Sequence, residues 1–140
     1  MKLQYIIVFV LLIAVNGCNN VDNNGLEGSW EIIEFRMIQG GNEVMNSTAK
    51  NLKDAGAVWD LNFSENGKFS QNFNMRNPQM KMETEKGSWT VSGDSIKIEL
   101  LSDTLTTKMN YKYKISNDTL NLSLTHPISK SSVITKFTKK

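Results

Sequence analysis

The residues that could act as an acid, a base or a nucleophile are few and widely separated in this sequence. His126 is the only histidine and Cys18 the only cysteine of the 140 residues, so the chain cannot form a two-histidine metal site, an internal disulfide or a Cys-based zinc site. His126 precedes Pro127 in a connecting segment, where a solvated loop histidine is the expected arrangement. The sequence contains no Gly-x-Ser-x-Gly, phosphate-binding or dinucleotide-binding motif. We therefore expect neither an enzyme nor a bound cofactor.

Two further groups of side chains have types that could bind or catalyse. Glu83 and Glu85 would share one face of a strand, as paired catalytic carboxylates do, but the lysines that flank them favour a solvated charged edge. Met75, Met80 and Met82 could be soft ligands for Cu(I). Methionine more commonly fills gaps in a core or a pocket wall. We expect these methionines to pack rather than to bind a metal.

The composition excludes several classes of protein. Hydrophobic residues make up 39% and charged residues 21% of the chain, which fits neither a disordered protein nor a polytopic membrane protein. The formal net charge is +2, from 16 Lys and Arg against 14 Asp and Glu, and a general nucleic-acid binder is usually more basic. The length is typical of one domain.

The N-terminus predicts export. Lys2 supplies a positive charge, and an uninterrupted apolar run follows from Tyr5 to Val15. This run is too short to cross a bilayer, which needs about 20 helical residues. A positive start, a short apolar stretch and small residues after it are typical of a secretory signal peptide.

The end of that segment is similar to a known processing site. Val15-Asn16-Gly17-Cys18 resembles the lipobox of bacterial lipoproteins, in which an aliphatic residue and two small residues precede a cysteine. The resemblance implies a signal peptide over residues 1–17, a diacylglycerol on the Cys18 thiol and an acyl chain such as palmitate on its amino group, which would anchor the protein to a membrane. Asn19, in place of the aspartate that favours inner-membrane retention, implies the outer membrane of a Gram-negative bacterium. Residues 18–26, rich in Asn and Gly, would form a flexible tether.

The rest of the chain shows the period-2 alternation of strands. It is clearest over Leu105–Ile115, where apolar and aromatic residues alternate with lysines and other polar residues. Asn66-Gly67 separates two such runs and is typical of a tight hairpin. Residues 47–56 are the one helix candidate, with Ser47 or Thr48 as its cap. Strands are expected near residues 29–38, 58–64, 68–75, 80–91, 95–101, 104–115, 118–125 and 131–138.

This pattern predicts an all-β fold over residues 27–140. An eight-stranded antiparallel up-and-down β-barrel would remove both exposed edges of the sheet, and a two-sheet sandwich fits the same pattern. One expected strand is irregular, because Met80 and Met82 have the opposite parity to Trp89 and Val91. That mismatch predicts a bulge near Gly87 or a break near residues 83–86.

Several short motifs resemble the lipocalin-like domains of bacterial lipoproteins. They are Leu26-Glu27-Gly28-Ser29-Trp30, Asn66-Gly67-Lys68-Phe69, Gly87-Ser88-Trp89, Gly93-Asp94 and Leu120-Asn121-Leu122. The resemblance implies a calycin-type barrel whose floor carries Gly28 and Trp30. Typical lipocalins have an arginine on the last strand; this chain has none there, and Lys136 is the candidate for its covering role.

The barrel interior leads to two functional hypotheses. A hollow barrel would bind a small apolar or amphipathic ligand. A filled barrel would serve as a structural or protein-interaction module, with an exposed apolar patch near residues 40–57 or 74–82 and with protein partners that the sequence does not identify. The candidate interior residues are Trp59, Phe69, Phe73, Met75, Trp89, Tyr111 and Tyr113.

Overall fold

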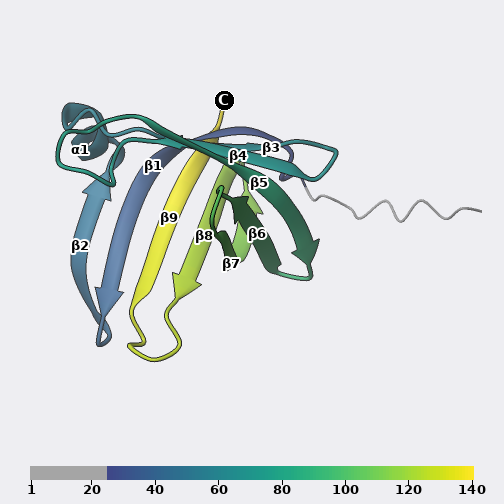
Figure 1. The fold of residues 1–140 in the computed structure, drawn as a ribbon. Helices are drawn as coiled ribbons and strands as arrows, with labels where there is room; N and C mark the ends of the chain where they lie inside the picture. The colour runs from purple at the N-terminus through teal and green to yellow at the C-terminus, as the bar shows by residue number, and fades with distance from the viewer. Residues whose placement is uncertain (1–24) are drawn as a thin grey trace, which may run out of the picture.

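The computed structural model describes residues 25–140 as a barrel of antiparallel strands with one short helix (Figure 1). The predicted signal peptide, Cys18 and most of the predicted tether lie outside the described residues. The elements are β1 (Gly28–Gln39), β2 (Asn42–Thr48), α1 (Ala49–Asp54), β3 (Trp59–Phe63), β4 (Lys68–Phe73), β5 (Glu83–Ser92), β6 (Ser95–Leu101), β7 (Thr106–Ser116), β8 (Thr119–Thr125) and β9 (Ser132–Lys139).

The barrel closes between its first and last strands. From β3 to β9 each strand pairs with the next one along the chain, and β1 pairs with both β3 and β9. The β1–β9 ladder runs from Trp30 opposite Lys139 to Ile38 opposite Ser132. Eight strands, β1 and β3 to β9, therefore form a closed antiparallel barrel, as the sequence predicts, and the sandwich alternative is wrong.

Strand β2 is an addition that the sequence reading missed. Residues Gly40 and Gly41 both have positive φ, as a tight hairpin requires, and β2 returns along the second half of β1. The first half of β1, Gly28 to Glu31, pairs instead with β3. Strands β2 and β3 thus follow one another along the same edge of β1, with α1 between them.

Helix α1 lies within the predicted 47–56 segment but is shorter. Thr48 is its N-cap and forms a capping box with Asn51, in which each side chain bonds the backbone N–H of the other residue. Leu52 is the one buried residue of the helix.

The expected strand over residues 80–91 begins later, at Glu83. Met80 has a φ of 52° and lies in the connection before β5, so the chain breaks before this strand and not near residues 83–86 as predicted. From Glu83 onward β5 pairs without interruption with β4 and with β6, and no bulge occurs at Gly87. Glu83, Glu85, Gly87 and Trp89 therefore share the inner face of β5.

The core fills one end of the barrel and leaves the other end open. Short turns close the filled end, among them Asn66-Gly67 and Asn117-Asp118, while the longer connections, residues 74–82, 102–105 and 126–131, lie at the open end. The packed cluster consists of Leu26, Trp30, Leu61, Phe63, Phe69, Trp89, Ile96, Ile98, Leu100, Leu120, Leu122 and Phe137. The interior of the barrel is thus solid at the closed end only.

Candidate functional site

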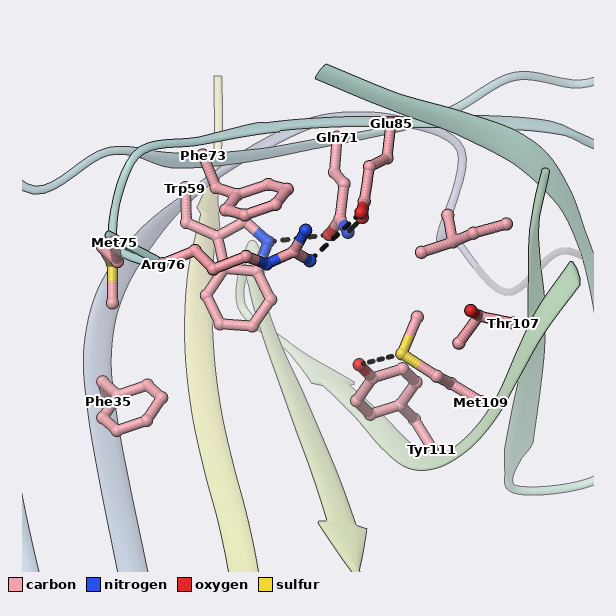
Figure 2. A pocket seen from close by; sticks show the side chains of 11 residues that line it. Phe35, Trp59, Gln71, Phe73, Met75, Arg76, Glu85, Thr107, Met109 and Tyr111 are labelled. Carbon is pink, nitrogen blue, oxygen red and sulfur yellow. Dashed lines mark hydrogen bonds and ion pairs between the residues drawn. The ribbon is translucent and has the colours of Figure 1, made fainter. Parts of the chain in front are cut away.

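A cavity of about 500 Å³ occupies the open half of the barrel (Figure 2). Its wall combines aromatic rings, thioethers and a small number of polar side chains from β1, β3, β4, β5, β6, β7 and the connection after β4. The lining residues are Phe35, Trp59, Gln71, Phe73, Met75, Arg76, Glu85, Leu100, Thr107, Met109 and Tyr111.

Strand alternation places these side chains. On β4 the inward positions are Phe69, Gln71 and Phe73, so Gln71 is buried although it is polar. On β7 every second residue from Thr107 to Tyr111 faces the cavity. Leu100 of β6 lies opposite Thr107 and forms the boundary between the cavity and the packed cluster.

The polar lining groups form one connected network. The Trp59 Nε1–H donates to Gln71 Oε1 at 2.9 Å, and Gln71 Nε2 donates to Glu85 Oε2 at 2.6 Å. Arg76 Nη2 donates to the other oxygen, Glu85 Oε1, at 3.0 Å. Among the described residues, no buried side-chain nitrogen or oxygen lacks a partner. The buried indole N–H and the amide are therefore satisfied, as burial of polar groups requires.

Arg76 lies at the centre of this network. Its second terminal nitrogen, Nη1, donates to Glu83 Oε2 at 3.1 Å, so one guanidinium group links two carboxylates. The guanidinium carbon lies 4.5 Å from the centroid of the Phe73 ring, a cation–π contact. Figure 2 shows the group turned toward Gln71 and Glu85, above the space between Trp59 and Tyr111.

Tyr111 closes the opposite side of the cavity. Its hydroxyl donates to the Met109 sulfur at 3.2 Å. Burial and, to a smaller extent, the negative charge of Glu85 together raise the pKa of the Tyr111 hydroxyl to about 12. The phenol is therefore neutral at physiological pH.

The stability of the protein should fall at high pH because of Tyr111. The Tyr111 hydroxyl has a higher pKa in the folded protein than the value of about 10 in the unfolded chain. Its contribution to stability is therefore fully present below about pH 10 and is lost as the pH rises toward 12. We expect the free energy of unfolding to fall by about 2 kcal/mol between pH 9 and pH 11.5, relative to Tyr111→Phe. Urea unfolding at a series of pH values measures both proteins, and parallel pH profiles would contradict the prediction.

Comparison with known proteins agrees with this architecture. The sequence model of the lipocalin-like domain matches residues 26–122. The chain belongs to the lipocalin-like domain family. Its fold is similar to the crystal structure of a lipocalin-like protein from Bacteroides uniformis, with a TM-score of 0.54 and 18% sequence identity, covering 82% of this chain and 98% of that one. The fold is also similar to the crystal structure of an uncharacterized protein from Bacteroides eggerthii, with a TM-score of 0.51 and 14% sequence identity, covering 81% of this chain and 98% of that one. No curated protein matches the sequence.

The lipocalin-like barrel separates the candidate interior residues into two groups. Trp59, Phe73, Met75 and Tyr111 line the cavity. The other three belong to the packed half, where Phe69 and Trp89 are buried in the cluster and Tyr113 is partly buried against it. The rings of Phe69 and Trp89 each contact Phe63, with centroids 5.1 and 5.4 Å away.

Most of the polar residues that line the cavity were not predicted from the sequence. Glu85 faces the cavity and binds Gln71 and Arg76, so its expected place on a solvated charged edge is wrong. Glu85 lies four residues before Trp89 on the same strand, so it must face the same side of the sheet. The inward position predicted for Trp89 therefore also indicates an inward Glu85. No comparable signal marks Arg76, because it lies in the connection after β4. The missed lining residues are Phe35, Gln71, Arg76, Glu85, Leu100, Thr107 and Met109.

The floor of the lipocalin-like domain has Gly28 and Trp30 where the resemblance places them. Trp30 is completely buried and donates its Nε1–H to the carbonyl oxygen of Leu26 at 2.8 Å. Lys139 Nζ lies 5.4 Å from the centroid of the Trp30 ring. Lys136, which was expected to cover Trp30, instead forms an ion pair with Glu34 at 2.8 Å. The lysine that covers the Trp30 ring is Lys139.

The remaining candidates lie away from the cavity. His126 is exposed in the connection between β8 and β9, and its Nδ1 accepts the backbone N–H of Ser129. Met82 is half exposed and does not line the cavity. Within residues 25–140, no three His, Cys, Asp or Glu side chains are grouped closely enough to hold a metal ion. The only helix described there, α1, is far too short to span a membrane.

Proposed function

We propose that this lipocalin-like domain is a binding protein for one small apolar or amphipathic molecule, held in the open half of the barrel. The observation that carries the proposal is the division of the interior, which is packed at the closed end and hollow at the other. A cavity of about 500 Å³ falls within the usual range for small-molecule sites. Eight-stranded barrels of the lipocalin type commonly hold one small ligand.

The composition of the wall supports an apolar or amphipathic ligand. Phe35, Trp59, Met75, Met109 and Tyr111 offer carbon, sulfur and ring faces, while the charged and amide groups lie together on one side. Such a wall favours burial of an apolar body and fixes only one end of the ligand through polar contacts. The filled-barrel alternative requires a packed interior at both ends, and the cavity argues against it.

The rim of the open end supports access by an apolar molecule. The large apolar side chains that are exposed within residues 25–140 all lie on β2 or beside the long connections at this end. Val44, Met45 and Met82 lie in the two regions, residues 40–57 and 74–82, where the filled-barrel alternative predicts an exposed apolar patch. The residues are Val44, Met45, Met82, Leu101, Leu105 and Ile128. Apolar side chains at the open end offer contacts to a ligand of this class as it enters the cavity.

Filling the cavity should abolish binding. Thr107 lines the cavity and Thr106 is its neighbour on the opposite face of β7. We expect Thr107→Trp to lose the fluorescence enhancement of the neutral apolar probe N-phenyl-1-naphthylamine, because the indole occupies the cavity. Thr106→Trp adds the same side chain outside the barrel and should bind the probe like the parent protein. Equal binding by both variants, or no binding by the parent protein, would overturn the proposed function.

We further propose that the domain is a lipoprotein of the cell envelope, anchored by an acylated Cys18. The apolar run, the lipobox resemblance and the single cysteine support this proposal. Cys18→Ala is expected to move the protein from the membrane fraction to the soluble fraction of its native host. Mass spectrometry of the parent protein should show a chain that begins at Cys18 and carries acyl groups. A protein that stays with the membrane after Cys18→Ala, or an unmodified Cys18, would show the anchor to be wrong.

We also propose that the protein is a carrier rather than an enzyme. Its one histidine lies in an exposed connection, and its cavity carboxylate, Glu85, is held by Gln71 and Arg76. Glu85 is thereby placed to orient a ligand through hydrogen bonds.

A further inference from the structure

The charges beside the cavity suggest which kind of amphipathic molecule it selects. Resting on the proposed binding function, we infer that the preferred ligand has a cationic polar end, such as an amine, and that fatty-acid anions are disfavoured. Arg76 is the one cationic residue of the cavity lining, and carboxylates of the protein already bind it.

Both terminal nitrogens of Arg76 already bind carboxylates of the protein. Nη1 is bound to Glu83 and Nη2 to Glu85, and the guanidinium group also stacks on the Phe73 ring. A ligand carboxylate at the remaining N–H groups would lie beside two negatively charged glutamates, which repel it. The usual reason for an arginine in a pocket, bidentate binding of a ligand anion, is therefore met here by the protein's own carboxylates.

The cluster of Arg76, Glu83 and Glu85 carries one net negative charge. The charge of Glu85 acts across the cavity, because it contributes to the raised pKa of the Tyr111 hydroxyl on the far wall. A cation in the space between them would be attracted to the cluster, whereas an anion would be repelled. The side chains of Glu83 and Glu85 are only 32% and 25% exposed, so solvent screens this interaction less than at an open surface.

The rings on the cavity wall favour the same sign of charge. Trp59, Phe35 and Tyr111 surround the space beneath Arg76, as Figure 2 shows. The faces of aromatic rings carry negative electrostatic potential and attract ammonium groups. The network and the rings are independent features, and both favour a cationic head over a carboxylate.

Ligands with one tail and three different heads test the inference. Decylamine, 1-decanol and decanoate at pH 7 would each be titrated against bound N-phenyl-1-naphthylamine at low salt. We expect decylamine to bind about tenfold more tightly than decanoate, with decanol between them. Decanoate binding as tightly as decylamine, or more tightly, would overturn the inference and leave the proposed function standing. If none of the three displaces the bound probe, the inference is wrong and the bound probe still supports the proposed function, whereas a parent protein that does not bind the probe would overturn both.

Charge-matched variants locate the source of the preference. Glu85→Gln neutralises the cluster and should remove the preference for decylamine, whereas Arg76→Gln makes the cluster more negative and should increase it. Glu99→Gln is the control, because it removes the same charge from the outer face of β6, where Glu99 pairs with Lys97 and Lys108. A preference that Glu99→Gln changes as much as Glu85→Gln would reflect net charge alone and would overturn the inference.

Discussion

Gly87→Ala is expected to lower the free energy of unfolding by about 3 kcal/mol or more, although it adds only one methyl group. Gly87 lies on the inner face of β5, opposite Leu100 of β6. A Cβ at this position would overlap the carbonyl oxygen of Glu99 and lie 2.8 Å from its carbonyl carbon and 3.0 Å from the Leu100 Cα. These atoms belong to the backbone of the neighbouring strand, so no side-chain rotation can relieve the overlap. Urea unfolding measures the loss.

The neighbouring residue provides the control for Gly87. Ser88 is exposed on the outer face of β5, and Ser88→Ala is expected to change stability by less than about 0.5 kcal/mol. If Gly87→Ala unfolds at the same urea concentration as Ser88→Ala, the close approach of β5 and β6 is not present in solution.

Trp30→Ala is expected to cost about 3–5 kcal/mol of stability, because it leaves a large cavity in the packed end of the barrel. Trp30 is completely buried, its indole N–H bonds the Leu26 carbonyl, and Lys139 lies over its ring. The substitution removes apolar contact and leaves the Leu26 carbonyl without its partner. Urea unfolding followed by circular dichroism measures the loss without relying on the deleted fluorophore.

The control for Trp30 removes a large apolar side chain from the opposite end. Ile128 is 86% exposed at the rim, and Ile128→Ala should leave stability within about 0.5 kcal/mol of the parent value. The cavity does not include Trp30. A Trp30→Ala protein that is destabilised but still folded should therefore still bind the probe. A Trp30→Ala protein as stable as the Ile128→Ala protein would contradict the packed floor.

Local rules predicted most of the barrel. Alternation and the Asn66-Gly67 turn determine which residues pair, and closure follows because open edges are unfavourable. Strand β2 escaped prediction because its residues, Asn42 to Thr48, lack apolar alternation. The β2 strand is specified by the Gly40-Gly41 turn and by the length of β1, which extends beyond β3 and leaves an edge to be paired.

The candidate site was harder to predict than the fold. Trp59, Phe73, Met75 and Tyr111 were found because large apolar residues on inward positions must lie inside the barrel. Whether such a residue packs or lines a cavity depends on its height along the barrel axis, which the pairing register sets and alternation alone does not reveal. A charged residue such as Glu85 is expected to face solvent when its strand is considered alone. It faces inward here because Gln71 and Arg76, from other segments of the chain, bind its carboxylate.

The way the chain enters the barrel has a consequence for the proposed lipoprotein. Leu26 is buried beneath Trp30, Lys139 Nζ donates to the Gly25 carbonyl, and Lys140 bonds back to Ser29, so both ends of the described chain meet at the floor. A tether from Cys18 would join the domain at its base. The mouth would then lie at the end of the domain opposite its attachment, and a flexible tether would leave it free to take up cargo from the aqueous space.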